Sequence, residues 1–200
     1  MTDLSPREIA TWHREVCKVN DWLIISGDLP PTRWAAEEKL QEWIDAGVTD
    51  IVDVRGEWSD EELVKELAPS IRYHYLGTHD DGTNQDHQWF HDGIAALHKA
   101  LEHDDAVVMV HCHMGVNRGP SMALAFLIDQ GWDPLEALDA IREARPIAGI
   151  IYARDAVEAT APALEAKGHV IEDLQERIQQ WFQHNRIDIA TIIRWIRRSE

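Results

Sequence analysis

The stretch AVVMVHCHMGVNRGPSMALAFLIDQG, residues 106–131, decides the fold expected for this chain. It opens with a short apolar run, residues 106–110, whose length and β-branched content are typical of a buried strand. Pro120 suits the first turn of a helix, the apolar residues after it extend that helix, and Gly131 can end it. The stretch therefore predicts a strand, a loop and a helix in succession.

The loop between this strand and this helix holds Cys112 and Arg118, separated by five residues. Backbone N–H groups that point inward from a tight turn, together with a helix N-terminus, form an anion site. Gly115 permits such a turn, and the planar guanidinium of Arg118 can hold two phosphate oxygens at once. The same field stabilises a thiolate on Cys112, which is the nucleophilic form. The residues expected to bind phosphate are His113, Met114, Gly115, Val116, Asn117 and Arg118.

The string HCHMGVNRGPS closely resembles the H-C-x-x-G-x-x-R signature of cysteine-dependent protein phosphatases, particularly the dual-specificity group. The resemblance extends upstream through WLIISGDLPP, IVDV and YHYLGTHDDG, and downstream to about Ala166. It implies a phosphatase that forms a phosphocysteine on Cys112, with Arg118 stabilising the equatorial oxygens. It implies no cofactor.

Two other interpretations of the cysteine remain open at this stage. A buried cysteine behind an apolar strand can be only a small hydrophobe, and His111-Cys112-His113 has the composition of a metal cluster. Neighbouring residues on a strand point to opposite faces, so these three side chains would not readily converge on one ion. We therefore expect no metal site here.

The segment GTHDDGTNQD, residues 77–86, offers the acid that such a reaction needs. Expulsion of an alkoxide or phenoxide is slow unless a carboxylic acid protonates the leaving oxygen. In dual-specificity phosphatases the acid precedes a helix with an aromatic pair, and the pair Trp89-Phe90 resembles that landmark. Aligned on it without a gap, Asp80 takes the acid position. Asp81 is the alternative acid and a candidate substrate contact, whereas Asp86 suits a helix N-cap.

Composition bounds the class of protein. The formal net charge of −17 argues against nucleic acid and anionic membranes as partners, because both attract basic surfaces. The start, MTDLSPREIATW, lacks the apolar run of a signal peptide, and no stretch is long enough to span a membrane. Two cysteines, Cys17 and Cys112, form no disulfide framework, and a nucleophilic thiol needs a reducing compartment. We therefore expect a cytoplasmic enzyme.

The rest of the chain alternates strands and helices. Strands are expected over residues 22–25, 48–54 and 71–76, and helices over 34–46, 86–102, 133–144 and 153–167, with a further helix from Pro6. Capping-box patterns at Ser5/Glu8 and Ser59/Glu62 mark two helix starts. This alternation predicts an α/β fold with a central, largely parallel sheet of four to five strands flanked by helices.

One arginine outside the loop is a candidate substrate-binding residue. Arg55 follows the strand expected over residues 48–54, and open α/β sheets bind their ligands at the carboxyl ends of their strands. The alternative is an arginine at the surface paired with Asp53 or Glu57. The sequence does not decide between the two.

Residues 1–168 are expected to form the phosphatase domain, including an N-terminal helix within residues 1–20, and residues 169–200 a helical extension. Two amphipathic segments in this extension, separated near Asn185, suggest a helical hairpin packed on the domain. Self-association through these helices, giving a homo-oligomer, is the alternative.

The expected function, implied by the family resemblance, is hydrolysis of phosphotyrosine in proteins or peptides. The depth of the pocket decides whether phosphoserine and phosphothreonine are substrates as well. Gly119 departs from the family pattern, which usually has Ser or Thr there to ease departure of the cysteine from the intermediate. This departure keeps a phosphate-binding pseudophosphatase as an alternative. Sulfurtransferases of the rhodanese type and arsenate reductases use similar cysteine loops, but they generally lack the upstream acid.

Overall fold

The computed structural model describes residues 5–199, so residues 1–4 and 200 of the expected domain and extension lie outside it. A five-stranded sheet forms the centre, in the order β1-β2-β5-β3-β4. Its strands are β1 (Cys17–Lys18), β2 (Leu23–Ser26), β3 (Asp50–Arg55), β4 (Arg72–Thr78) and β5 (Val108–His111). Strands β2, β5, β3 and β4 run parallel, and only β1 is antiparallel. The predicted α/β fold with a largely parallel sheet is therefore confirmed. The short edge strand β1 was not among the strands predicted from the sequence.

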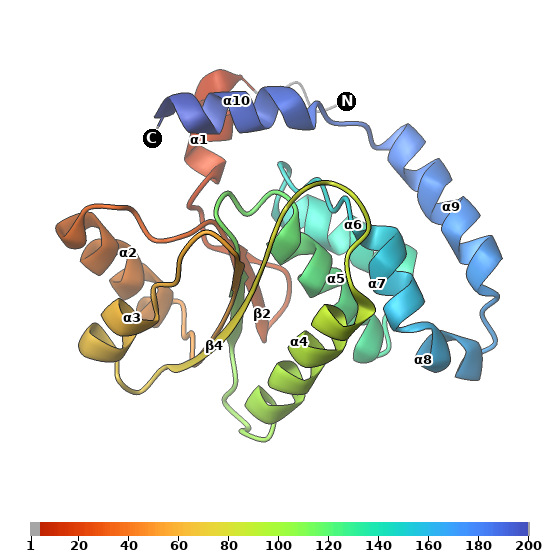
Figure 1. Cartoon of the computed structure of the whole chain (residues 1–200), viewed down its shortest axis with the longest axis horizontal. Coiled ribbons are helices and arrows are strands. Elements are labelled where there is room, and N and C mark those ends of the chain that lie inside the picture. Colours follow the sequence, from red (N-terminus) through yellow and green to blue (C-terminus); the bar gives the residue numbers. More distant parts are fainter. Residues whose placement is uncertain (1–4, 200) are drawn as a thin grey trace.

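Alternating strand residues divide the core into two layers. Val108 and Val110 point to one face of the sheet, where α4 (His87–Ala100) and α5 (Arg118–Asp129) cover them. Met109 points to the other face, covered by α2 (Arg33–Asp45) and α3 (Glu61–Leu67). Figure 1 shows these two helical layers on opposite sides of the strands. The period-two pattern of side chains explains why short apolar strands can support both layers.

The helix ends follow local signals closely. Helix α1 (Pro6–Trp12) begins with reciprocal hydrogen bonds between Ser5 and Glu8, as the capping-box pattern predicts. Asp86 caps α4 by accepting a hydrogen bond from the backbone N–H of Gln88. The N-cap of α3 is Asp60, one residue later than the Ser59 pattern indicates.

The C-terminal half adds α6 (Pro134–Ala144), α7 (Ala153–Ala159), α8 (Ala161–Ala166), α9 (Ile171–His184) and α10 (Ile189–Ser199). Helix α9 packs on α6, α7 and α8, whereas α10 packs on α1 (Figure 1). The two helices therefore lie on different parts of the domain, and the hairpin expected from the sequence is not formed. Within the described residues, no helix combines the length and the apolar character needed to cross a lipid bilayer.

Candidate active site

Cys112 stands at the C-terminal end of β5, and Arg118 is the first residue of α5. Gly115, midway along the loop between them, has a φ of 61°, a backbone conformation that favours glycine. A Cβ at this position would lie 2.6 Å from the carbonyl oxygen of Ser26 and against the guanidinium of Arg145. The loop can therefore turn as tightly as it does only with glycine here.

Arg145 holds the outer side of this loop. Its side chain is fully buried, and it donates to the carbonyl oxygens of Gly115 at 2.6 Å and Met114 at 3.1 Å. It also donates to the carbonyl of His13 and to the sulfur of Cys17, both in the N-terminal segment. One buried guanidinium thus fixes the loop to the segment that runs from His13 to the start of β1.

The carbonyl groups of His113 and Val116 also point away from the inside of the loop, toward the surrounding protein. The carbonyl of His113 accepts from the N–H of Asp28 at 3.0 Å, and that of Val116 from the N–H of Gly149 at 2.6 Å. In a trans peptide the N–H points opposite to the preceding C=O. The four carbonyls from His113 to Val116 therefore direct four consecutive N–H groups, from Met114 to Asn117, toward the inside of the loop. No acceptor among residues 5–199 pairs with these N–H groups.

These inward N–H groups meet the thiol of Cys112 in one cavity, which we call the cysteine pocket. It has a volume of about 280 Å³, and Cys112 itself is only 2 % exposed. Its charged lining residues are Glu57, Asp80, Asp81, Arg118 and Arg197. A cluster of inward amides at a helix N-terminus suits a dianion.

Arg118 is oriented by Glu57. Its two terminal nitrogens each donate to one carboxylate oxygen of Glu57 at 2.8 Å, and Nη1 also donates to the carbonyl of Thr78. Burial acts to raise the pKa of Glu57, but the hydrogen bonds and charge of Arg118 outweigh it and keep that pKa below its ordinary value. Glu57 binds the terminal nitrogens of the guanidinium, so only the Nε edge, which makes no hydrogen bond within the described residues, is left to bind a phosphoryl group.

Asp80 lies against the loop, and two donors fix one of its oxygens. Oδ1 accepts from the amide of Asn117 at 2.7 Å and from the hydroxyl of Tyr152 at 2.9 Å. Oδ2 lies 3.4 Å from Nε of Arg118. Burial raises the pKa of Tyr152 to about 12, so its hydroxyl remains a donor at neutral pH. Since Oδ1 is already an acceptor twice, a proton carried by Asp80 belongs on Oδ2, beside the loop.

Asp81 and Asp86 occupy different places from Asp80. Asp81 is exposed at the rim of the cysteine pocket and accepts from the backbone and hydroxyl of Thr83. It therefore lies where a substrate could meet it, but outside the set that contacts Arg118. Asp86 caps α4 and does not line the pocket.

Arg55 does not reach the cysteine pocket. It is fully buried, and its guanidinium is paired with Asp28 at 3.1 Å, Asp53 at 3.1 Å and Asp60 at 2.8 Å. The expectation that Arg55 contacts substrate is therefore corrected: its role in the described structure is to neutralise three carboxylates. The pairing with Asp53 that the sequence suggested is present, but in the interior rather than at the surface.

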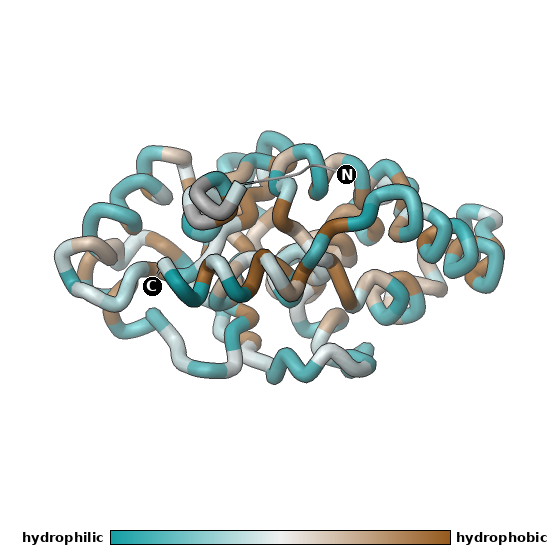
Figure 2. The backbone as a smooth tube through the Cα atoms, turned by 90° about the horizontal axis from the view of Figure 1, so that it is seen from above, coloured by the Kyte–Doolittle hydropathy of each residue, from teal (hydrophilic) through white to brown (hydrophobic). Residues whose placement is uncertain are grey.

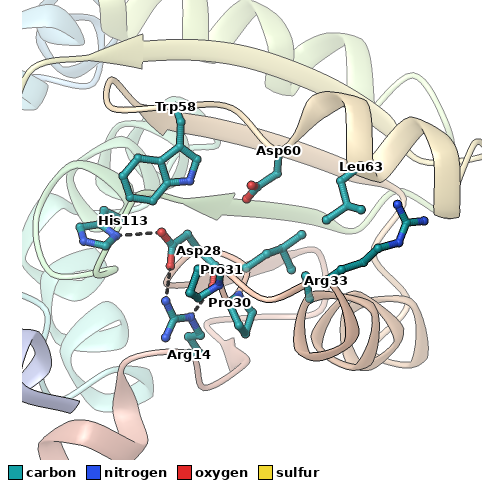
Figure 3. A pocket seen from close by; sticks show the side chains of 11 residues that line it. Arg14, Asp28, Pro30, Pro31, Arg33, Trp58, Asp60, Leu63 and His113 are labelled. Carbon is teal, nitrogen blue, oxygen red and sulfur yellow. Dashed lines mark hydrogen bonds and ion pairs between the residues drawn. The ribbon is translucent and has the colours of Figure 1, made fainter. Parts of the chain in front are cut away.

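A second cavity lies on the other side of His113, and we call it the flanking cavity. It has a volume of about 650 Å³ and is lined by Asp28, Pro30, Pro31, Trp58, Leu63 and His113, among others. Figure 3 shows Asp28 between His113 and Arg14, with which it pairs at 2.8 Å and 2.9 Å. Its polar groups are thus engaged with one another.

Among residues 5–199, two groups of three side chains place potential metal-ligand atoms within 4.8 Å of one another. They are His13 with Asp28 and His113, and the partly exposed set His87, Asp155 and Glu158. In the first group the carboxylate of Asp28 already pairs with Arg14 and Arg55, and these positive charges oppose a cation. His111 and His113 diverge, since His111 contacts Trp43 and His113 binds Asp28. The His-Cys-His triplet is therefore not gathered around one point.

Sequence reasoning missed several residues that shape the site. Glu57 binds Arg118 from 61 residues away in the chain, Arg145 binds Met114 of the loop from 31 residues away, and Tyr152 binds Asp80 from 72 residues away. The pair Arg145-Pro146 after a predicted helix is the one local signal near Arg145, and it indicates only a helix end. A buried arginine with several carbonyl partners cannot be recognised before the fold is known.

The sequence model of the dual specificity phosphatase catalytic domain matches residues 37–151. The chain is 40% identical over 57 residues to the Probable tyrosine-protein phosphatase pir-2 of Caenorhabditis elegans, a match that covers 28% of this chain and 16% of that protein. The chain thus corresponds to only a small part of that relative.

Solved structures of this kind share the fold. Human DUSP28 aligns with a TM-score of 0.59 at 19% identity, over 77% of this chain and 95% of that one. PTPMT1 aligns with a TM-score of 0.57 at 24% identity, over 76% and 99% of the two chains. The human tyrosine phosphatase-like serine/threonine/tyrosine-interacting protein aligns with a TM-score of 0.59 at 17% identity, over 76% and 99%. Because the family model covers more than half of the chain, this protein belongs to the dual specificity phosphatase family.

Proposed function

We propose that this protein hydrolyses phosphate monoesters of tyrosine, and also of serine and threonine, in proteins or peptides through a phosphocysteine on Cys112. One observation carries the proposal. The inward N–H groups, Cys112, Arg118 and Asp80 all line the cysteine pocket, with Oδ2 of Asp80 3.4 Å from Nε of Arg118. Nucleophile, anion cradle and acid are therefore supplied in one place.

The first step transfers the phosphoryl group to sulfur. The Cys112 thiolate attacks phosphorus, an S–P bond forms, and the P–O bond to the substrate breaks. The loop N–H groups and Arg118 stabilise the charge on the equatorial oxygens. Asp80 gives its Oδ2 proton to the leaving oxygen, so tyrosine, serine or threonine departs as a neutral hydroxyl.

The second step releases phosphate. Asp80, now a carboxylate, accepts a proton from a water molecule that attacks phosphorus. The S–P bond breaks, inorganic phosphate forms, and Cys112 regains its thiolate. Asn117 and Tyr152 are positioning residues in both steps, because their hydrogen bonds to Oδ1 keep Oδ2 directed at the loop.

Gly119 affects the rate of the second step, the hydrolysis of the phosphocysteine. The family usually has a hydroxyl there, and the nearby Ser121 does not replace it, because its hydroxyl bonds Asn117 at 3.3 Å and accepts from the N–H of Tyr152. We propose that hydrolysis of the phosphocysteine is slower than its formation. A Cβ at Gly119 would meet the N of Cys112 at 3.4 Å, an ordinary contact, so the loop has room for Gly119→Ser. Wild type should give a burst of about one equivalent of product, and Gly119→Ser should reduce it.

Turnover of an aryl phosphate tests the proposal. Cys112→Ser should abolish hydrolysis while vanadate or phosphate binding persists, because the loop N–H groups and Arg118 remain. Cys17→Ser is the matched control, since it removes the other thiol and keeps an acceptor for Arg145. Hydrolysis that survives in Cys112→Ser, or that is lost only in Cys17→Ser, contradicts the proposal.

A second candidate function is recognition of phosphorylated peptides without turnover. Gly119 favours it, because the hydroxyl that normally assists release of phosphate is absent from that position. Wild type would then bind a phosphotyrosine peptide, and no product would form beyond the first equivalent. Repeated turnover under the same conditions excludes this alternative.

A further inference from the structure

Helix α10 forms one wall of the cysteine pocket, although it lies outside the residues matched by the family model. Ile189, Ile193 and Arg197 line this pocket together with Cys112, and their spacing of four places them along one stripe of the helix. Figure 2, seen from above, shows α10 crossing the face of the molecule with apolar and hydrophilic residues in alternation. The pocket is therefore shared between the family domain and the C-terminal helix.

A second stripe of α10 fixes the helix in this place. Ile192 and Ile196 are buried in a cluster with Ile9 of α1, Ile147 and Val116. Val116 belongs to the loop between Cys112 and Arg118, so the helix packs on the phosphate-binding loop itself. The position of Arg197 relative to Cys112 is thus set by buried contacts rather than by a loose tail.

The charge of this helix is opposite to that of the protein around it. The chain has a net charge of −17, and the family domain contributes Glu57, Asp80 and Asp81 to the cysteine pocket. Residues 186–198 instead contain four arginines and a single acid, Asp188. Arg118 is already paired with Glu57. The pocket therefore gains its second cation from α10.

Arg197 differs from its neighbours in what surrounds it. Arg198 stacks on the ring of Trp195, 4.9 Å from its centroid, and lies outside the pocket. Arg197 is exposed at the pocket lip, and no carboxylate among residues 5–199 forms an ion pair with it. A guanidinium in this state suits an anion brought by a ligand.

We propose that Arg197 binds a second anionic group of the substrate, a carboxylate or a phosphate, beside the phosphorylated residue whose phosphoryl group enters the loop. This inference rests on the proposed phosphatase function and extends it to the substrate class: phosphopeptides with acidic or doubly phosphorylated flanks. Ile189 and Ile193 provide apolar contact for the substrate between the two anions. Arg197 acts on binding and not on the reacting atoms, so it should affect KM more than kcat.

Three phosphotyrosine peptides that differ only in the flanking residues test this inference: Gln, Glu or a second phosphotyrosine. Wild type should have a kcat/KM about fivefold higher for the Glu peptide than for the Gln peptide, as expected for one exposed ion pair. Arg197→Gln should bring this ratio close to one through KM, and Arg197→Glu should invert it. Arg194→Gln, an exposed arginine of α10 outside the pocket, is the matched control and should keep the wild-type ratio.

The same assay distinguishes a carboxylate from a phosphate as the group that Arg197 binds. Preference for the doubly phosphorylated peptide over the Glu peptide identifies phosphate as the better ligand. Binding of the three peptides to Cys112→Ser repeats the comparison without turnover. Equal use of the Gln and Glu peptides by wild type, or a ratio unchanged in Arg197→Gln, overturns this inference and leaves the proposed function intact. Failure of wild type to turn over any of the peptides overturns the proposed function, while the binding ratio still decides the role of Arg197.

Discussion

The cysteine pocket and the flanking cavity meet at His113, and they use charged residues in opposite ways. The flanking cavity is larger, about 650 Å³ against about 280 Å³. Its carboxylate Asp28 is buried and paired with Arg14, Arg55 and His113. In the cysteine pocket the loop N–H groups and Nε of Arg118 make no hydrogen bond among the described residues, and Nε has only Oδ2 of Asp80 beside it, at 3.4 Å.

This difference shows that the larger of two cavities need not be the reactive site. A closed network of buried charges stabilises a fold only by being complete, because removing one member leaves the others uncompensated. Donors that face a pocket without partners contribute little to the fold, but they are ready for a ligand. We therefore expect changes in the cysteine pocket to lower turnover, and changes in the network beside the flanking cavity to lower stability.

Among the variants that test this comparison, Arg118→Lys should cause the largest loss of turnover. Lysine keeps the charge but loses the fork that holds two phosphoryl oxygens. We expect kcat/KM for a phosphotyrosine peptide to fall about 10³- to 10⁴-fold, in line with the loss of a main donor to a transferring phosphoryl group. Steady-state kinetics measure the loss, and urea unfolding should show a smaller change than in the Arg55 variant below. Activity within tenfold of wild type would contradict the expectation that changes in the cysteine pocket lower turnover.

Arg55→Met should lower the stability of the fold more than it lowers turnover. It removes the only guanidinium that contacts Asp28, Asp53 and Asp60 together in the described structure, and it leaves Asp53 and Asp60 without an arginine partner. We expect a loss of about 4 kcal/mol in the free energy of unfolding, which lowers Tm by about 10 °C for a chain of this size. Thermal unfolding tests this directly. The comparison fails if Arg55→Met is as stable as wild type and loses only turnover.

Asp80→Asn tests the acid within the cysteine pocket. We expect kcat/KM for a phosphoserine peptide, which reports formation of the phosphocysteine, to fall about 10²- to 10³-fold, and kcat/KM for an aryl phosphate with a good leaving group to fall less. Asp81→Asn is the matched control and should stay near wild type, because Asp81 contacts only Thr83 at the rim. If Asp81→Asn shows the larger loss, the acid assignment passes to Asp81.

The smallest expected effect is on the pH dependence of stability, and it comes from His13, which lies against the loop beside the flanking cavity. Burial, and then the charge of Arg14, lower the pKa of His13 to about 3, whereas the unfolded chain has a value of about 6.5. Between these values the unfolded state binds more protons, so stability falls as pH decreases, by up to about 1.4 kcal/mol per pH unit. The lowered pKa of Asp28 acts in the same direction at the acidic end.

Urea unfolding between pH 7 and about 4.5 measures this slope. His13→Gln should have a shallower slope than wild type, and Cys112→Ser should keep the wild-type slope. Equal slopes in wild type and His13→Gln would show that this histidine is not held neutral in the folded state.

Local sequence signals predicted the central elements well. The run before Cys112 is β5, and the α6 bounds predicted from Asp133 and Pro134 agree with the structure. Such features depend on period, caps and turn residues, which act within a few positions of one another. The α/β class followed from their order along the chain.

The errors involve contacts between distant segments. The amphipathic faces of α9 and α10 were visible in the sequence, but their partners, α6 and α1, were not, so a hairpin was expected. Arg55 could be placed at a strand end, yet its burial depends on Asp28, 27 residues earlier. The same holds for Glu57, which orients Arg118 from 61 residues away.

The central claim is that phosphate passes through the sulfur of Cys112. Rapid mixing with a phosphotyrosine peptide labelled in its phosphate, acid quenching and mass spectrometry of the digested protein test it most directly. We predict close to one labelled phosphate per chain, located on the peptide that contains Cys112, and none in Cys112→Ser. Turnover that proceeds with no label on Cys112, or with the label on another residue, would contradict this account.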